Sequence, residues 1–411
     1  MFIMKAIFKK TAAFAASAML AAALAMPTMT ASASDMWADF VTSAQFTKEV
    51  VVQAEEQTGT VAAPVVSYSY VIEPLQEADV TGKTVTDKSG NTVGVKPGKT
   101  GGLTIGTDNS ATFSGTQTLS DGKAVFSDTV GVATDFSKFG APGVYRYKVT
   151  ETADPAELAT VGIARPANYD PIRYIDVYVN STEVYGIVMF AAGEPGDEVN
   201  STATKKSVGY TDSSQDTEQT VDPTTGLADV YFLYNYTVEK KVENSALLTA
   251  PTFSFTVTMT GVEGQKYDDG TKEVATPVTA ELGDGDKIEL KNIPANVTIS
   301  VSEKNTSQAT YDVTAADSKL GSVELDNASL AVSGTSGFKA AAALSNIASA
   351  ADASAVQKSL DTTTFTNKQV DISPTGLVFM IAPFAIMLSA GAFLFGLFTK
   401  NRKKDDAESI I

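Results

Sequence analysis

An uncharged apolar run near the end of the chain sets the strongest limit on how this sequence can fold. It extends from Leu377 to Phe398. These roughly 22 residues would form a helix about 33 Å long, which is enough to cross a bilayer. A basic cluster follows at once, consisting of Lys400, Arg402, Lys403 and Lys404. Because positive charge flanks the cytoplasmic end of membrane spans, the run predicts that nearly all of the chain lies outside the cell.

The first residues have the pattern of a secretory signal peptide. They open with a basic segment that contains Lys5, Lys9 and Lys10. The Ala-rich apolar stretch Thr11–Met26 follows, and it is too short to span a membrane comfortably. Ala31–Ala33 then offers the small residues that a signal peptidase needs. We therefore expect residues 1–33 to be removed, so that the mature chain begins near Ser34.

Five residues just before the apolar run resemble the LPXTG-type sorting signal that sortases recognise on Gram-positive surface proteins. They are Ile372, Ser373, Pro374, Thr375 and Gly376. Ile372 stands where such signals have leucine, and it keeps a branched apolar side chain. In that family a transpeptidase cuts between Thr and Gly, so the resemblance implies that Thr375 becomes the new covalent end. The alternative is an ordinary tail-anchored helix preceded by a Pro-Gly turn.

Composition excludes several classes of function. The chain has no cysteine, so an exported fold of this kind has no disulfides to strengthen it. It has no histidine either, which removes His-based acid–base catalysis, Ser-His-Asp and Cys-His nucleophile systems, and the usual zinc sites. The net charge of −17 argues against nucleic acid as a partner, because phosphates would repel such a surface.

Most of the mature chain has the pattern of short β-strands separated by turns. Thr, Ser and Val are frequent, and Gly and Asp recur where turns are expected. Apolar residues alternate with polar ones in many segments, which is typical of half-buried strands. The clearest are residues 46–52, 67–72, 144–151, 174–179, 184–190, 230–241, 253–257, 287–290, 297–303 and 362–367. Residues 80–122 and 193–226 resist assignment, and a short helix is one interpretation of residues 340–350.

This order of elements predicts an all-β chain of two tandem Ig-like β-sandwich domains. We place the first domain at residues 34–236 and the second at residues 237–370. Residues 371–411 then hold the sorting signal, its transmembrane helix and the basic tail. Asn235 and Lys240 are so close in sequence that one continuous strand could pass from one domain into the other.

Lysine, glutamate and asparagine recur in the same order in both domains. The first set is Lys48, Glu151 and Asn235, and the second is Lys240, Glu303 and Asn367. In each set the lysine lies in the first strand of its domain and the asparagine in the last. Lys241 is a second candidate for the partner of Asn367.

The segments around these sets resemble the two-domain major pilins of group A streptococci (the T-antigen backbone), whose domains carry intramolecular isopeptide bonds. The turn 139–143 and the following strand up to Glu151 match that family, and residues 147–155 also fit the "E-box" of Gram-positive pilins. In the second domain the matching segments are 284–285, 292–294, 301–303 and 365–368. The resemblance covers most of residues 40–411, and it implies that each set forms a Lys–Asn cross-link beside a catalytic glutamate, Glu151 or Glu303.

The chemistry of such a cross-link can be argued from the residues themselves. A lysine amine attacks an amide only when neutral, and burial among apolar side chains lowers the lysine pKa. The same burial raises the pKa of a neighbouring carboxyl, which can then polarise the amide and transfer protons as ammonia leaves. The aromatic residues expected to enclose the sites are Tyr145, Tyr147, Phe232 and Tyr234 in the first domain and Phe253, Phe255 and Phe365 in the second. The alternative is a surface Lys–Glu ion pair near an unrelated asparagine. Such a pair contributes about 0 to 1 kcal/mol to the stability of the fold.

The sequence therefore predicts a secreted, cell-wall-anchored pilus shaft subunit of a Gram-positive bacterium, which forms its internal cross-links in single-turnover reactions and is not an enzyme. Its expected partners are a sortase, peptidoglycan and other pilin subunits, with the membrane only before sorting. No cofactor or metal is expected, because the acidic runs 268–270 and 283–286 have turn spacing and no EF-hand pattern. Lys205 and Lys206 are the candidate polymerisation lysines, since no lysine lies between Lys206 and Lys240. The alternative is a non-polymerised wall-anchored adhesin, or a basal or minor pilin, that binds a host or matrix ligand.

Overall fold

The computed structural model is mostly β, as the alternating sequence pattern predicts. It describes residues 45–87, 90–106, 110–166, 169–190, 209–210, 228–243, 250–305, 311–317, 321–322, 329–330, 335–339 and 362–370. The expected signal peptide, the sorting pentapeptide and its apolar run, Lys205, Lys206 and the helix expected near residues 340–350 lie outside these ranges. In the ranges given, no helix is both long and apolar enough to cross a membrane.

One sheet runs through both halves of the molecule. Its strands are, in spatial order, β2 (Thr58–Ala62), β8 (Thr116–Ser120), β9 (Lys123–Thr134), β1 (Gln45–Ala54), β15 (Asp229–Glu243), β26 (Thr362–Gln369), β22 (Tyr311–Asp317) and β23 (Gly321–Ser322). Further strands pair at its sides: β6 (Leu103–Ile105) with β9, β11 (Ile163–Ala164) and β20 (Lys287–Pro294) with β15, β14 (Gly209–Tyr210) with β1, and β24 (Ser329–Leu330) with β22.

Two further sheets belong to one half of the molecule each. In the first half the order is β13 (Val184–Phe190), β12 (Ile172–Val179), β10 (Gly143–Glu151), β3 (Ser67–Pro74) and β7 (Ser110–Thr112), with β5 (Thr92–Pro97) beside β10 and β4 (Thr84–Thr86) beside β5. In the second half it is β19 (Val278–Leu282), β16 (Phe253–Thr260), β21 (Thr298–Asn305) and β25 (Thr335–Lys339). The helical segments are α2 (Glu77–Val80), α3 (Pro155–Thr160) and the 3₁₀ turn Phe136–Lys138.

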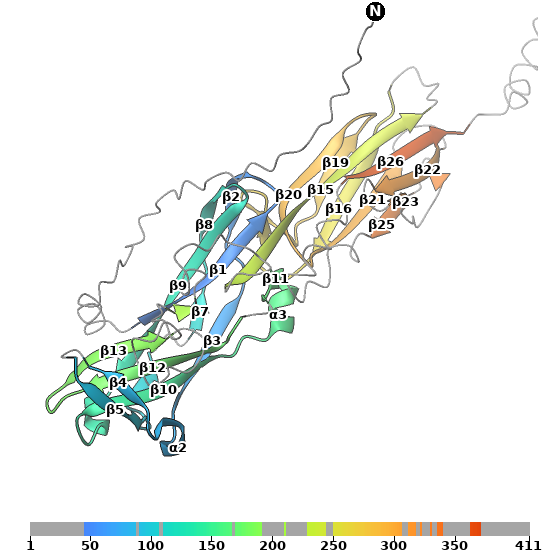
Figure 1. Ribbon diagram of the computed structural model, residues 1–411. Coiled ribbons are helices and arrows are strands. Elements are labelled where there is room, and N and C mark those ends of the chain that lie inside the picture. Colours follow the sequence, from blue (N-terminus) through green and yellow to red (C-terminus); the bar gives the residue numbers. More distant parts are fainter. Residues whose placement is uncertain are drawn as a thin grey trace, which may run out of the picture.

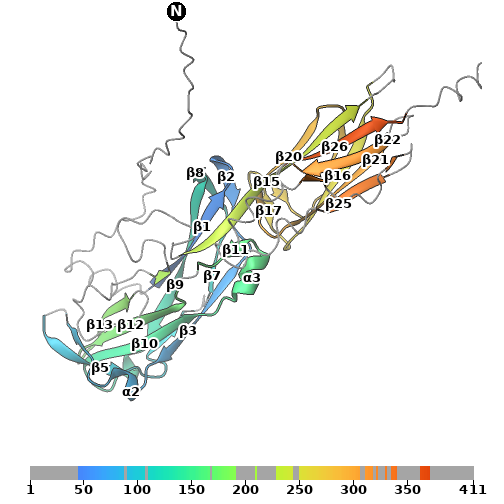
Figure 2. The same ribbon diagram turned by 45° about the vertical axis from the view of Figure 1, so that its right-hand side comes forward.

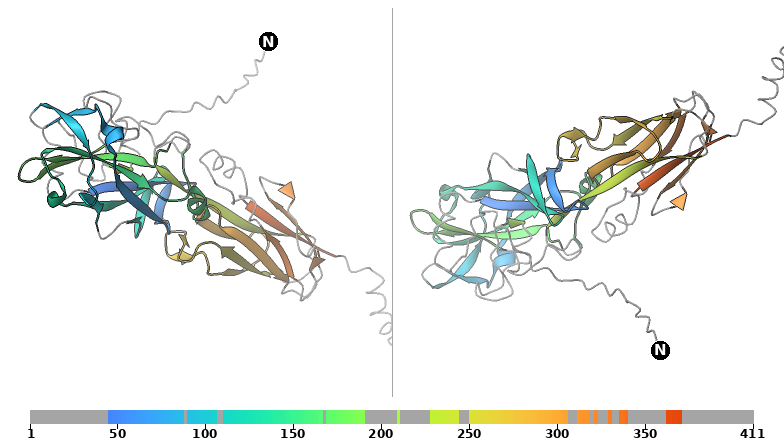
Figure 3. Two further views of the ribbon diagram at one scale, coloured as in Figure 1. Left: turned by 90° about the horizontal axis from the view of Figure 1, so that it is seen from below. Right: turned by 90° about the horizontal axis from the view of Figure 1, so that it is seen from above.

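The two halves lie end to end, and β15 joins them. Figures 1 and 2 show the blue and green first half and the yellow to red second half along one long axis, and Figure 3 shows the same elongation from below and above. The beginning of β15 pairs in parallel with β1, from Asp229 to Leu233. Its end pairs in parallel with β26, from Thr237 to Glu243. One strand therefore closes the first half and opens the second.

Each half has its own buried core between two sheets. In the second half the core unites inward residues of β15, β26 and β20 with those of β16 and β21, including Val238, Phe365 and Phe255. In the first half it unites residues of β1, β9 and the start of β15 with those of β3, β10 and β12. Burial of these apolar faces is the main stabilising contribution to the fold, at roughly 25 cal/mol per Å².

The two acidic segments of the second half, residues 268–270 and 283–286, lie in turns, as expected. Strands β17 (Lys266–Tyr267) and β18 (Lys272–Glu273) make a short hairpin around residues 268–271. In it the Asp269 carboxylate accepts hydrogen bonds from Thr271. The segment 283–286 is a turn closed by a hydrogen bond from the Gly283 amide to Asp286. Side chains engaged in this way support turns, as the spacing indicates.

Candidate functional site: two buried lysine clusters

In the second half, Lys240, Glu303 and Asn367 converge from three strands. Lys240 is on β15 and is paired across the parallel ladder with Phe365 of β26. Asn367 lies two residues further along β26, so it faces the same side of the sheet. Glu303 comes from β21 in the facing sheet. All three residues have an exposed fraction of 0%.

The lysine and the asparagine meet at one carboxyl group. The Lys240 Nζ lies 3.2 Å from Glu303 Oε1. The Asn367 Nδ2 donates a hydrogen bond to the same oxygen at 2.5 Å. Lys240 Nζ also donates to the carbonyl oxygen of Phe365 at 3.4 Å. Glu303 is therefore in position to exchange protons with both the amine and the amide.

Among the residues that the structure describes, two polar atoms of this cluster have no hydrogen-bond partner. They are Glu303 Oε2 and Asn367 Oδ1, and both are buried. A buried acceptor without a partner costs about 1–3 kcal/mol, so each such atom needs an explanation, and a catalytic role is one. A proton on Glu303 would turn Oε2 into a donor beside an amide whose carbonyl oxygen lacks one.

Apolar surroundings shift both ionisable groups toward their neutral forms. Burial lowers the pKa of Lys240 to about 8, against the opposing effect of Glu303. Burial likewise raises the pKa of Glu303. The Lys240 Nζ lies 4.4 Å from the centre of the Phe253 ring and 6.0 Å from that of Phe255. Phe255 in turn packs edge-on against Phe365 at 5.4 Å, so the three phenylalanines expected to enclose this site do so.

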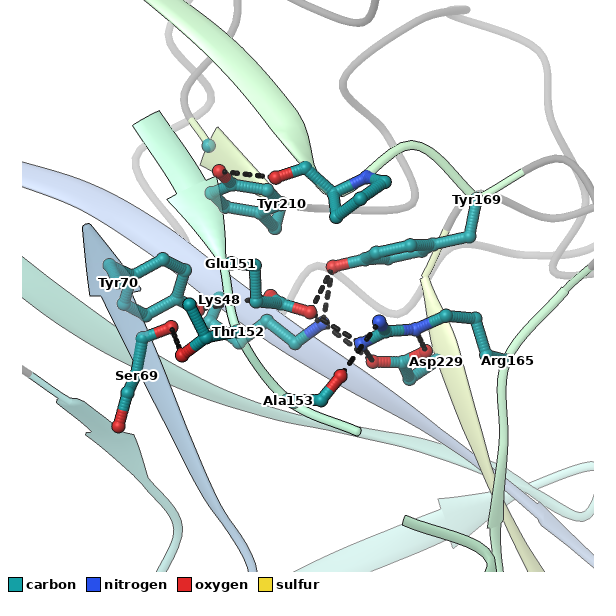
Figure 4. A network of polar contacts seen from close by, with 12 residues as sticks. Lys48, Ser69, Tyr70, Glu151, Thr152, Ala153, Arg165, Tyr169, Tyr210 and Asp229 are labelled. Atoms are coloured by element: carbon teal, nitrogen blue, oxygen red, sulfur yellow. Dashed lines mark hydrogen bonds and ion pairs between the residues drawn. The ribbon is translucent and has the colours of Figure 1, made fainter. Parts of the chain in front are cut away.

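In the first half, Lys48 and Glu151 also meet, but their partner is an aspartate. The Lys48 Nζ on β1 lies 3.2 Å from Glu151 Oε2 at the end of β10. It lies 2.8 Å from Asp229 Oδ2 at the start of β15. The side chains of all three are fully buried. Figure 4 shows this group, with Lys48 pointing between the two carboxylates.

The expected pairing of Lys48 with Asn235 is wrong in this structure. The parallel register sets Leu233 opposite Ala54, so Asn235 is level with Glu56 and about 26 Å along the strand from Lys48. Its Nδ2 donates to Glu56 at 3.0 Å, and its Oδ1 accepts from the Asn292 amide at 3.1 Å. Asn235 therefore ties the two halves together at their junction and takes no part in the buried cluster.

An arginine that the sequence did not single out completes the first cluster. Arg165 follows β11, and its Nε donates to Asp229 Oδ1 at 2.9 Å. Its Nη2 donates to Asp229 Oδ2 at 3.0 Å and to Glu151 Oε1 at 2.5 Å. Arg165 belongs to no repeated pattern, and only the pairing of β11 with β15 brings it here. Asp229 lies on the same strand as Asn235, so aspartate is a candidate partner as well as asparagine, but only the register of β1 and β15 places it beside Lys48.

Tyrosines form the walls of the first cluster. Lys48 Nζ lies 4.1 Å from the centre of the Tyr68 ring and 4.7 Å from that of Tyr169. The Tyr169 hydroxyl donates to Glu151 Oε1 at 2.7 Å and accepts from Lys48 Nζ at 2.9 Å. The Tyr70 hydroxyl donates to Glu151 Oε2 at 3.2 Å. Burial, and after it the nearby carboxylates, raise the pKa of the Tyr169 hydroxyl, which keeps it a donor.

The aromatic residues expected to line the first site lie elsewhere. The hydroxyl of Tyr145 donates to the carbonyl oxygen of Ala141, and that of Tyr147 donates to the carbonyl oxygen of Lys99. Phe232 and Tyr234 belong to the core of the second half. Their neighbours on β15, Tyr231 and Leu233, face the first core instead. The side chains of β15 thus alternate between the two cores, which the sequence alone does not reveal.

Comparisons with known proteins were made for sequence and for structure. Residues 234–369 match the family DUF7601, described as a domain of unknown function. That range begins inside β15 and ends at the last residue of β26. No curated protein sequence matches the chain.

The solved structures that resemble this chain include pilins and an adhesin. The T-13 major pilin of Streptococcus pyogenes has 17% identity and a TM-score of 0.38, and the match covers 79% of this chain and 97% of that one. The T3.2 major pilin of the same species has 21% identity and a TM-score of 0.37, over 79% and 98%. An adhesin from Mobiluncus mulieris containing disulfide, isopeptide and ester cross-links has 12% identity and a TM-score of 0.24, over 80% and 99%. The chain is thus similar in structure to Streptococcus pyogenes major pilins over 79% of its length, at low sequence identity.

Proposed function

We propose that this chain is a cell-wall-anchored, major pilin-like shaft subunit of two tandem Ig-like domains, and that its second domain forms a Lys240–Asn367 isopeptide bond unaided. One observation carries the proposal: an amine, an amide and a carboxyl lie together at 0% exposure. The chain has no cysteine to strengthen an exported fold, and this bond would do so without one.

The bond forms in a single turnover. The neutral Nζ of Lys240 attacks Cγ of Asn367 while protonated Glu303 polarises the amide carbonyl. The Nζ–Cγ bond forms, the Cγ–Nδ2 bond breaks, and ammonia leaves with a proton that Glu303 transfers from the amine. The atoms balance without a cofactor, because one amine and one primary amide give one secondary amide and one ammonia.

The position of the bond suits a subunit that bears tension. Lys240 and Asn367 lie on neighbouring parallel strands, the first and last of the domain. Force applied along these strands would load a covalent bond before the ladder hydrogen bonds. The bond also closes a loop of roughly 130 residues, which stabilises the domain by about 5 kcal/mol if the disulfide relation applies.

Anchoring rests on the sequence motifs at the two ends. Secretion would follow from residues 1–33, and a sortase would join Thr375 to peptidoglycan or to another subunit. Lys205 and Lys206 are the proposed acceptors for the next subunit. The molecule would then sit on the surface of a Gram-positive cell.

A wall-anchored adhesin, or a basal or minor pilin, is the second candidate. The observation in its favour is that no lysine lies between Lys206 and Lys240, close to the end of the first domain. Such a protein would use the same internal bond and the same anchor, but would bind a host or matrix ligand as a single copy.

Release of the cell wall with a muramidase separates the two candidates. A shaft subunit gives a ladder of high-mass species on a denaturing gel, and the T375A variant loses both the ladder and the wall-bound fraction. A single wall-bound species contradicts the shaft role and supports the adhesin. Loss of the ladder in a K205A/K206A double variant, with the anchored monomer retained, would identify the acceptor lysines.

A further inference from the structure

The first cluster differs from the second in its balance of charge. Lys48 and Arg165 face Glu151 and Asp229, so two cations oppose two carboxylates. In the second cluster Lys240 faces the single carboxyl of Glu303. Other groups around the first cluster are hydroxyls and one arginine: Tyr68 and Tyr70 from β3, Tyr169 after β11, Tyr210 from β14, and Arg173 from β12, whose guanidinium lies 4.5 Å from the Tyr210 ring.

Arg165 donates hydrogen bonds to both carboxylate oxygens of Asp229. The two hydrogen bonds, of 2.9 and 3.0 Å, form the parallel fork that a guanidinium makes with a carboxylate. A guanidinium keeps its charge in proteins and cannot give up a proton to a neighbour. Although burial by itself would raise the pKa of Asp229, the charges of Lys48 and Arg165 hold that pKa below its ordinary value. Asp229 is therefore a carboxylate at neutral pH.

Amide formation from Lys48 and Asp229 requires both groups to be uncharged. The amine must be neutral to attack, and the carboxyl must carry a proton to become an electrophile and lose water. In this fully paired set, in which three charges are buried and Arg165 is 12% exposed, each cation is stabilised by an anion at 2.5 to 3.2 Å. Moving a proton from Lys48 to Asp229 would remove one of these pairs while Arg165 still favours the anion.

We propose that Arg165 holds Lys48, Glu151 and Asp229 as a buried ion-pair network that does not condense, so that ionic contacts close the first domain and a covalent bond closes the second. This inference rests on the proposed function only for the comparison between the two sites. It makes Arg165 a positioning residue that acts through Asp229 and Glu151.

Removal of the guanidinium reverses this balance. In the R165Q variant one ammonium faces two carboxyl groups in a buried site, so one carboxyl takes up a proton. Lys48 can then transfer its own proton to the remaining carboxylate and attack Asp229. The Nζ–Cγ bond forms, a Cγ–O bond breaks and water leaves, with a mass loss of about 18 Da.

Intact mass measured on residues 34–375 tests the inference. The unmodified chain is expected to lie about 17 Da below its formula mass, because only Lys240–Asn367 releases ammonia. R165Q is expected to lie about 35 Da below its own formula mass, and R165K, which keeps the charge, about 17 Da below. A loss of about 35 Da in the unmodified chain would overturn the inference and leave the proposed function intact.

The remaining outcomes are equally decisive. If R165Q folds but lies only about 17 Da below its formula mass, Arg165 does not prevent the condensation of Lys48 with Asp229. If R165K also loses water, the positive charge at position 165 is not what prevents it. No loss at all in the unmodified chain means that the proposed function fails, because the second-domain bond is then absent. If R165Q does not fold, digestion of the unmodified chain decides: separate peptides containing Lys48 and Asp229 support the ionic network, and a joined pair contradicts it.

Discussion

At the scale of residues, the surroundings of two lysines decide what each can do. The ammonium of Lys240 faces one carboxyl and one amide among phenylalanine rings. That of Lys48 faces two carboxylates and shares both with Arg165. Burial without full pairing favours neutral, reactive groups, and burial with full pairing favours charged, unreactive ones.

The rate of bond formation at Lys240 should depend on pH in a bell-shaped manner. Between the raised pKa of Glu303 and the lowered pKa of Lys240, about 8, the pair shares one proton. The reactive form, a neutral amine beside a protonated carboxyl, is a tautomer of that state. Above pH 8 the shared proton is lost, and below the Glu303 pKa the amine is charged, so the rate falls on both sides.

Refolding measures this profile. A chain recovered unfolded, before the bond forms, is diluted into buffers of different pH, and the loss of ammonia is followed by mass against time. The rate constant is expected to fall roughly tenfold between pH 7 and pH 9. A rate that keeps rising to pH 10 would mean that only the amine titrates and that Glu303 has no part as an acid.

At the scale of elements, β15 carries the organisation of both halves. It holds Asp229 for the first cluster, Asn235 for the junction and Lys240 for the second cluster. Its first residues pair in parallel with β1, the first strand of the first half. Its last residues pair in parallel with β26, the last strand of the second half. Tension along the molecule would therefore pass from one domain to the next without leaving this strand.

Local alternation predicted many of these elements well. Strands β1, β3, β10, β12, β13, β15, β16, β20, β21 and β26 coincide with the expected segments to within a few residues. Strands β9 and β22 were missed, and β9 carries a mixed pattern of partly buried positions. Lys240, Glu303 and Asn367, singled out by the order in which these residue types recur, converge in the structure because their strands have clear alternation, and the cross-link between them stays a prediction.

The first cluster could be predicted only in part, for a reason that lies in the register. Asp229 and Asn235 both have side chains that could react with Lys48, and they are an even number of residues apart on the same strand. Only the pairing of Asp229 with Val50 shows which of the two lies beside the lysine. A register between strands that are far apart in sequence depends on the whole sheet. Arg165 is placed by the same long-range pairing and leaves no local signal.

The N235A variant tests the role assigned to Asn235. It loses two hydrogen bonds between the halves, to Glu56 and from the Asn292 amide, so unfolding is expected to become easier by about 1–2 kcal/mol. Its intact mass should show the same loss relative to formula as the unmodified chain. The control is T279A, a change at an exposed position of the edge strand β19. A smaller mass loss in N235A would show that Asn235 forms a cross-link after all.

At the scale of the whole molecule, the proposed covalent bond and the proposed ionic network would close two end-to-end domains by different means. The long axis in Figures 1 to 3 runs along β15, and both clusters lie on that strand. A covalent bond in the second domain and an ionic network in the first would give the two domains different resistance to unfolding. This difference follows from one additional cation, Arg165.

The central claim is the covalent bond between Lys240 and Asn367, and a peptide map tests it most directly. Residues 34–375 are digested under denaturing conditions, together with the E303Q variant. The account predicts a branched peptide that joins Lys240 to Asn367, about 17 Da lighter than its two parts, and separate peptides from E303Q. Separate peptides with a free Lys240 amine from the unmodified, folded chain would contradict it.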